Sequence, residues 1–225
     1  MGYQLRMRVV ACSGLVLLCA ACGPSGAPPG PSATTTAHAV DPAGIDRVRT
    51  RLPADYEIAI LPKPTMPATF WGFAPGWVSD PTECGALATV GTQTGPRGWA
   101  ASGPGGIVYA LAASAPAPPA ELRAGCAAWT VTGGHTTASV ALGEGPQISD
   151  AQTLAITADA TTRVENGTET HSHASTLVAY LDDLAVSVTV VTDPGAGGAA
   201  LPEQLPAQLL GAAVQAIRGA GPGTR

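Results

Sequence analysis

The most regular pattern of apolar and polar positions lies near the end of the chain. Between Leu184 and Thr192 every second residue is a large aliphatic one, which is typical of a β-strand with one face packed on a core. The alternate positions are mostly small or polar. That second face suits either another covering layer or a shallow surface open to solvent.

Two longer strands are expected just before this one, at Leu154–Val164 and Glu169–Tyr180. The Glu-Asn-Gly sequence at 165–167 has hairpin-turn chemistry, and Asp182 with Asp183 makes the next turn. Strands that follow one another through tight turns form an antiparallel meander. Shorter strands are expected at Tyr56–Ile60, Trp99–Ser102, Ile107–Ala113, Thr130–Thr132 and Thr136–Leu142.

Helical periodicity is strongest at Pro202–Arg218, where the apolar residues form one stripe and Gly219 follows as a stop signal. Shorter helices are expected after the Asp-Pro pairs that begin at Asp41 and Asp80, and at Pro119–Ala128. A long helix with an apolar stripe needs a sheet to cover. The sequence therefore predicts an α+β domain with a mainly antiparallel sheet flanked by helices.

The first residues have the features of an export signal. Two arginines precede the uncharged apolar run Val9–Ala21, which is shorter than the roughly 20 residues that a membrane-spanning helix needs. Ala20, Ala21 and Cys22 resemble the lipobox of bacterial lipoproteins. The resemblance implies that residues 1–21 are a signal peptide and that Cys22 carries the acyl chains, palmitate among them, that hold the protein on the membrane.

Residues 22–40 have a different composition from the rest of the chain. They consist mainly of Gly, Pro, Ser, Ala and Thr, so they bury too little apolar surface to offset the entropy of ordering. We expect them to form a flexible tether. The remainder, 41–225, has a length that suits one folded extracytoplasmic domain.

The charge of the chain excludes one class of partner. The net charge is −5 and Lys63 is the sole lysine, so the mature part contains no run of basic residues that would follow a phosphate backbone. No nucleic acid partner is expected. The abundance of Ala, Gly and Pro resembles the coding bias of high-GC actinobacteria.

Two cysteines remain once the leader and the lipid anchor are set aside. Cys84 and Cys126 form an even pair in an exported protein, which favours a disulfide. Closing the loop between them would stabilise the fold by about 4 kcal/mol in the chain-entropy estimate.

Several short segments resemble mycobacterial lipoproteins of unknown function. They are FWGFAPGW at 70–77, the helix around Cys84, SGPGGIVYA at 102–110, CAAW at 126–129, and the last three strands with the terminal helix. These lipoproteins are in turn similar to the PknH-type extracellular sensor domain of a serine/threonine kinase. The resemblance covers about residues 45–218 and implies an envelope domain with a cleft for a ligand.

A cluster of large aromatic residues lies among prolines early in the domain: Phe70, Trp71, Phe73 and Trp77. These side chains could line an apolar ligand pocket. The commoner role of such a cluster is to cover the core beneath a long loop. Both interpretations remain open on the sequence.

Glu169, His171 and His173 share one face of an expected strand and could supply three metal ligands. A solvent-facing strand shows the same alternation, and no supporting second shell is readable. Because metal sites demand exacting ligand geometry, the solvated face is favoured. No metal or other cofactor is expected.

No catalytic fingerprint occurs in a suitable strand and helix context. A hydrolytic triad would have to combine a serine and a histidine from Ser102, Ser139, Ser175, His135, His171 and His173, together with an aspartate. Triads are recognised by geometry, and no spacing here implies one. An enzyme is therefore not expected.

These features together predict a membrane-anchored envelope lipoprotein whose domain binds a ligand or acts as a sensor without catalysis. A lipid or another apolar envelope molecule is the expected ligand class. The main alternative is a structural or protein-interaction lipoprotein with no small-molecule pocket, whose partner is another envelope protein. A metal-binding or hydrolytic protein that uses the Glu169, His171 and His173 face ranks below both.

Overall fold

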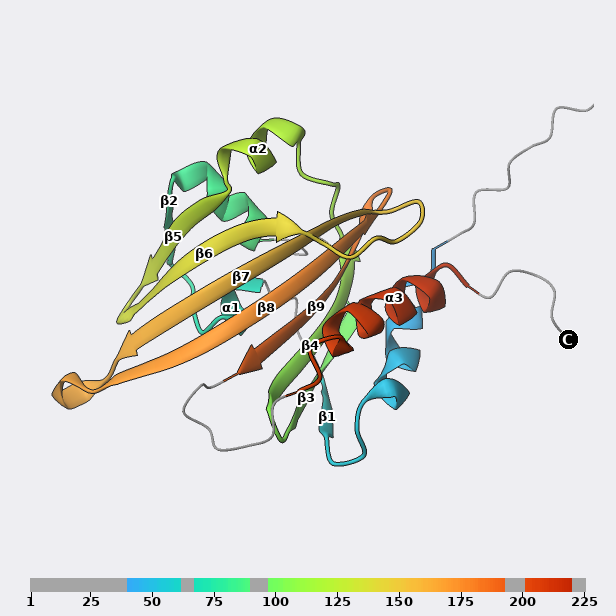
Figure 1. The fold of residues 1–225 in the computed structure, drawn as a ribbon, viewed down its shortest axis with the longest axis horizontal. Helices are drawn as coiled ribbons and strands as arrows, with labels where there is room; N and C mark the ends of the chain where they lie inside the picture. Colours follow the sequence, from blue (N-terminus) through green and yellow to red (C-terminus); the bar gives the residue numbers. More distant parts are fainter. Residues whose placement is uncertain (1–39, 62–66, 90–96, 193–200, 220–225) are drawn as a thin grey trace, which may run out of the picture. The chain divides into compact units, whose positions relative to one another are not determined.

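Nine antiparallel strands form one continuous sheet in the computed structural model, which describes residues 40–61, 67–89, 97–192 and 201–219 (Figure 1). Their order across the sheet is β1-β3-β4-β9-β8-β7-β6-β5-β2. The strands are β1 Glu57–Ile60, β2 Val78–Asp80, β3 Arg97–Gly103, β4 Gly106–Ser114, β5 Ala128–Gly133, β6 Thr136–Glu144, β7 Gln152–Arg163, β8 Glu169–Leu181 and β9 Leu184–Thr192. The helices are α1 Pro67–Phe70, α2 Ala120–Gly125, α3 Leu205–Ile217 and the 3₁₀ helices η1 Pro42–Arg51, η2 Thr82–Ala88 and η3 Glu165–Gly167. The expected α+β fold is confirmed.

The predictions for the N-terminus lie outside the described residues. They concern the signal peptide 1–21, the lipidated Cys22 and all of the tether 22–40 except its last residue, Val40. Within the part of the chain that is described, no helix combines the length and the apolar character needed to cross a membrane.

Strands β5 to β9 follow one another across the sheet as the expected meander. The β7–β8 turn places Asn166 and Gly167 at φ 77° and 78°, and the β8–β9 turn places Asp182 at φ 51°. Asn, Asp and Gly are the residues that adopt positive φ most readily. The turn chemistry therefore sets the register of both hairpins.

The β3–β4 hairpin joins this meander through a long-range pairing of β4 with β9. Ile107 lies opposite Val191 and Ser114 opposite Leu184, so β4 is paired along nearly its whole length. As a result β9 lies in the middle of the sheet, and both of its faces are covered. The smaller face of β9 therefore meets a second covering layer rather than solvent.

The two larger of three hydrophobic clusters among the described residues lie on opposite faces of the sheet. One face carries Val186 and Val188 beneath η1 and α3, in a cluster with Ile45, Val48, Trp99, Leu209, Leu210, Val214 and Ile217. The other face, toward the β5 edge, carries Trp71, Phe73, Leu87, Trp129 and Ile156. Side chains of successive strand residues point to opposite faces, so a single strand can contribute to both clusters.

The second cluster contains a buried polar link. Trp71 donates its Nε1 hydrogen to Thr176 Oγ1 at 3.1 Å, and Thr176 shares a 2.9 Å hydrogen bond with Thr189. Thr176 and Thr189 are almost fully buried. Because each polar atom has a partner, this link fixes the position of Trp71 without an unsatisfied group.

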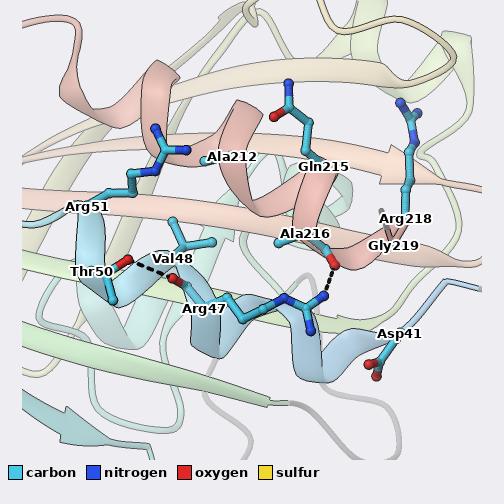
Figure 2. A pocket seen from close by; sticks show the side chains of 10 residues that line it. All are labelled: Asp41, Arg47, Val48, Thr50, Arg51, Ala212, Gln215, Ala216, Arg218 and Gly219. Carbon is cyan, nitrogen blue, oxygen red and sulfur yellow. Dashed lines mark hydrogen bonds between the residues drawn. The ribbon is translucent and has the colours of Figure 1, made fainter. Parts of the chain in front are cut away.

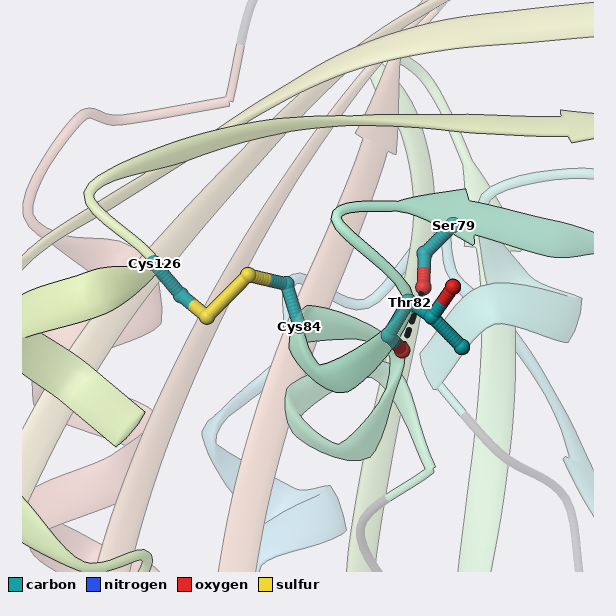
Figure 3. The surroundings of a disulfide bond; sticks show 4 residues. All are labelled: Ser79, Thr82, Cys84 and Cys126. Atoms are coloured by element: carbon teal, nitrogen blue, oxygen red, sulfur yellow. Dashed lines mark hydrogen bonds between the residues drawn. A yellow bond between two sulfur atoms is a disulfide. The ribbon is translucent and has the colours of Figure 1, made fainter. Parts of the chain in front are cut away.

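The helix expected after Asp80 begins elsewhere than the cap pattern predicts. Asp80 pairs with Thr130 as the last residue of the edge strand β2, and a cis peptide joins it to Pro81. η2 begins at Thr82 with no side-chain cap, while Ser79 Oγ donates to the Thr82 carbonyl oxygen at 2.9 Å (Figure 3). The cap prediction is wrong because sheet pairing holds the Asp80 backbone.

The bounds of two other helices also differ from the expected ones. α2 ends at Gly125, so Cys126 lies just beyond it. α3 begins at Leu205, three residues after Pro202. By contrast, Asp41 caps η1 as expected, because its Oδ1 accepts a 2.9 Å hydrogen bond from the Ala43 amide.

Cys84 and Cys126 form the expected disulfide, with Cα atoms 5.5 Å apart (Figure 3). The bond ties η2 to the chain that enters β5. Both cysteines are buried in the same cluster as Trp129. The disulfide thus fastens the covering segment 67–89 to the edge of the sheet.

η1 and α3 approach each other very closely. The Asp41 amide, at the start of η1, donates to the Ile217 carbonyl oxygen of α3 at 2.8 Å. η1 is also bound to the sheet, because Trp99 Nε1 of β3 donates to the Ile45 carbonyl oxygen at 2.9 Å. A Cβ placed on Gly44 would lie 2.4 Å from the Ala216 carbonyl oxygen. Only a glycine fits at this contact.

We predict that Gly44→Ala lowers the free energy of unfolding by about 1–3 kcal/mol, because the backbone of α3 must move to admit the methyl group. Gly211→Ala is the matched control, since a Cβ there meets no atom within 4 Å and lies inside α3. That variant should be up to about 1 kcal/mol more stable than the wild type. Urea unfolding measures both, and equal midpoints for Gly44→Ala and wild type would contradict the close contact.

We predict that Cys84→Ala/Cys126→Ala lowers the free energy of unfolding by about 4 kcal/mol, because the unfolded chain loses a cross-link over a sequence separation of 42. Thermal or urea unfolding measures the loss. Reducing the wild-type protein should produce a similar decrease. A double variant as stable as the oxidised wild type would show that the bond contributes nothing.

Candidate functional site

A groove with a cavity volume of about 950 Å³ lies between η1 and α3 in the described part of the chain (Figure 2). Three of its lining residues are arginines. Its walls comprise Asp41, Arg47, Val48, Thr50, Arg51, Ala212, Gln215, Ala216, Arg218 and Gly219. We call it the arginine groove.

Helical spacing on η1 produces one wall of the arginine groove. Ile45 and Val48 are buried against the sheet, so Arg47, Thr50 and Arg51 come to the outer side. Thr50 Oγ1 donates to the Arg47 carbonyl oxygen at 3.1 Å. The same short helix therefore contributes to the core and presents two guanidinium groups.

The α3 wall of the groove consists mainly of small residues. Ala213, Val214 and Ile217 are buried, and Ala212 and Ala216 line the groove between them. Short side chains at these two positions leave the space open. Figure 2 shows Arg47 reaching across this space toward Ala216.

The three groove arginines differ in what holds them. Arg47 donates from Nη2 to the Ala216 carbonyl oxygen, and Arg218 donates from Nη2 to the Asp150 carbonyl oxygen at 2.8 Å. Arg51 is exposed and makes no hydrogen bond or ion pair with another described residue. A guanidinium group has five N–H donors, so all three retain donors for a ligand.

Positive charge is concentrated around this groove. Four of the seven described arginines belong to η1 or follow α3: Arg47, Arg49, Arg51 and Arg218. Arg49 forms a 3.4 Å ion pair with Asp46, and Asp41 lies in the groove itself. The groove lining thus contains three arginines and one aspartate in a chain whose net charge is −5.

The second pocket lies on the same face of the sheet as η1 and α3, over strands β6 to β8, and has a volume of about 510 Å³. Apart from Gly134 its lining residues are all polar: His135, Thr137, Ser139, Asp159, Thr161, Arg163 and Glu169. Ser139 lies beside Asp159 across β6 and β7. These residues are the polar positions of β6, β7 and β8 that alternate with the buried ones.

The three candidate metal ligands each contact a different neighbour across β7 and β8. Glu169 Oε1 accepts from Arg163 Nε at 2.8 Å. His173 Nδ1 lies 2.7 Å from Asp159 Oδ1, and His171 Nδ1 lies 3.1 Å from Thr161 Oγ1. The structure therefore does not bring the three side chains together, and within the described ranges no group of three His, Cys, Asp or Glu residues is arranged to hold a metal ion.

The predicted aromatic site lies in the core. Phe70, Trp71 and Phe73 are only 6%, 1% and 2% exposed, and Phe70 stacks on Tyr109 with ring centroids 4.0 Å apart. Trp77 is partly buried at the edge of the same cluster. Neither pocket described above is lined by these side chains. Phe70, Trp71 and Phe73 are packed as core residues. Contact between the aromatic cluster and a ligand stays a prediction.

Three tyrosines have raised pKa values. Burial is the cause for Tyr109 and Tyr180, and burial followed by the charge of Asp55 is the cause for Tyr56. Each phenol therefore keeps its proton at neutral pH. None of the three lines either pocket, so they serve packing rather than proton transfer.

Residues 41–218 match the family described as Domain of unknown function (DUF5642). The chain belongs to this family. No curated protein matches it. The family description names no activity, so membership of the DUF5642 family shows which proteins the chain is related to but not what it does. Its function has to be inferred from the site.

Two solved structures resemble this DUF5642 domain. One is an uncharacterised protein from Mycobacterium smegmatis, an Rv0999 ortholog, with a TM-score of 0.56 and 22% identity over 80% of this chain and 98% of that chain. The other is the extracellular domain of PknH from Mycobacterium tuberculosis, with a TM-score of 0.40 and 16% identity over 76% of this chain and 88% of that chain. The family description and the first of these structures match the resemblance to mycobacterial proteins of unknown function that the sequence predicts. The first of them shows the shared fold.

Sequence reasoning missed the arginine groove of this DUF5642 domain. The only signal was the spacing of Arg47 and Arg51 on the outer side of the expected helix after Asp41. Arg218, which completes the groove, lies far away in the sequence at the end of the expected terminal helix. The pairing of the two helices creates the site.

Proposed function

We propose that this protein is a lipid-anchored, extracytoplasmic binding module of the cell envelope that acts without catalysis. The observation that carries this proposal is the arginine groove. Guanidinium groups stay protonated at physiological pH, so they bind anionic or hydrogen-bond-accepting groups but do not act as nucleophiles or proton carriers. The groove is thus suited to binding.

The disulfide supports an extracytoplasmic location. Structural disulfides form and persist in oxidising compartments and are rare in the cytosol. Cys84 and Cys126 are buried together, as a structural disulfide requires. The lipobox-like sequence Ala20-Ala21-Cys22 supports anchoring at the outer side of the membrane.

A second candidate function is a protein-interaction role, and the edge strands favour it. β1 and β2 end the sheet on its two sides, and both expose aliphatic side chains. Ile60 is 71% exposed on β1 and Val78 is 65% exposed on β2. An exposed edge strand with apolar side chains can pair with a strand of another protein.

The anchoring part of the proposal predicts that Cys22→Ala abolishes labelling by radioactive palmitate and releases the protein from the membrane fraction. Cys12→Ala and Cys19→Ala are matched controls, because both residues lie in the expected leader and should leave labelling unchanged. Membrane-bound, palmitate-labelled Cys22→Ala protein would refute the lipobox assignment.

The location is tested on the wild-type protein from the same cells. Denaturation without reductant should expose no maleimide-reactive thiol at Cys84 or Cys126, because export oxidises the pair. Reduced cysteines at these two positions would place the domain in the cytosol.

A further inference from the structure

We propose that the arginine groove is the surface that the domain turns toward the anionic headgroups of the membrane that anchors it. The occupant is the lipid phosphate of the bilayer surface rather than a free small molecule. This inference rests on the proposed lipid anchor at Cys22. It assigns a partner and an orientation to the groove.

The distribution of charge supplies the first argument. Among the described acidic residues, only Asp41 and Asp46 belong to η1 and its cap, and the other thirteen lie elsewhere, including Asp150 beside Arg218. Outside η1 and the end of α3, the described part of the chain has only three arginines: Arg97, Arg123 and Arg163. An anionic bilayer therefore repels most of the domain surface. The end that carries the groove arginines is the one it attracts.

The entry point of the chain supplies the second argument. Asp41 lines the groove, and its amide is hydrogen-bonded to Ile217 at the end of α3. The segment 23–40 joins this end of the domain to the proposed anchor and, even fully extended, spans no more than about 65 Å. The groove therefore lies next to the point where the expected tether joins the domain.

The arginine side chains are suited to lipid phosphates. Guanidinium groups bind phosphate oxygens with paired N–H donors, and Arg is more weakly hydrated than Lys. Arg47 and Arg218 are held in place by backbone carbonyl oxygens, while Arg51 is exposed on the same groove. Two arginines with fixed side chains and one with an exposed side chain together form a surface that can bind phosphate.

The test uses the processed, lipidated protein in two kinds of vesicle, one of phosphatidylcholine and one of phosphatidylcholine and phosphatidylglycerol in equal parts. Phenylglyoxal modifies accessible arginines, and peptide mass spectrometry measures the rate at each position. Arg51 should react at least about fivefold more slowly on the anionic vesicles than on the neutral ones. Arg97 and Arg163 are exposed internal controls, and each should react at the same rate on both kinds of vesicle. High salt should remove the difference because it screens exposed charges.

Matched variants test whether the groove causes the protection. Arg47→Gln/Arg218→Gln should restore most of the reactivity of Arg51 on anionic vesicles, whereas Arg97→Gln/Arg163→Gln removes the same charge elsewhere and should leave the protection intact. Circular dichroism confirms that each variant is folded. Protection that survives loss of Arg47 and Arg218 would overturn the proposal.

Other outcomes also decide against it. Equal reactivity of Arg51 on both vesicles, with the protein floating with each, would refute the membrane-facing groove and leave the anchor intact. Failure to float with phosphatidylcholine vesicles would refute the anchor, and the inference with it. Protection of Arg51 by inorganic phosphate on neutral vesicles, equal to that on anionic ones, would identify a free-anion site instead.

Discussion

The rest of the structure depends on the pairing of β4 with β9. This pairing joins the hairpin β3–β4 to the meander β5–β9, and it places β9 where both of its faces are buried. Val186 and Val188 then meet η1 and α3, while Thr189 meets Thr176 beneath the opposite layer. β9 thus contributes to the packing on both faces of the sheet, and loss of either covering layer would expose one of its faces.

The division into two clusters explains why the groove is where it is. The disulfide fastens one covering layer near β5, and η1 with α3 covers the opposite face at the other side of the sheet. The helices meet through Gly44 and Ala216, and their outward residues are arginines beside alanines. The same contact that closes this cluster therefore produces an open, basic surface at the point where the N-terminal segment enters. η1 and α3 thus cover the core with their inner sides and form the proposed membrane contact with their outer sides.

Local chemistry allowed much of the fold to be predicted from the sequence. The Asn166-Gly167 turn, the alternation along β9 and the apolar stripe of α3 are decided by neighbouring residues, and so is the disulfide pair once the leader cysteines are set aside. The pairing of β4 with β9 could not be predicted, because many small apolar strands would serve equally as partners. β2 was missed because it is three residues long, and pairing with Thr130 overrode the capping preference of Asp80. The groove needs Arg47 and Arg218 together, and only tertiary packing brings them close.

Native-state hydrogen exchange of β4 and β9 tests the central role of their pairing most directly. If this pairing unites the two clusters, the most protected amides of β4, β8 and β9 share one opening free energy, equal to the global free energy of unfolding. The account is contradicted if the β3–β4 amides exchange through a separate opening of clearly lower free energy while β5 to β9 stay protected.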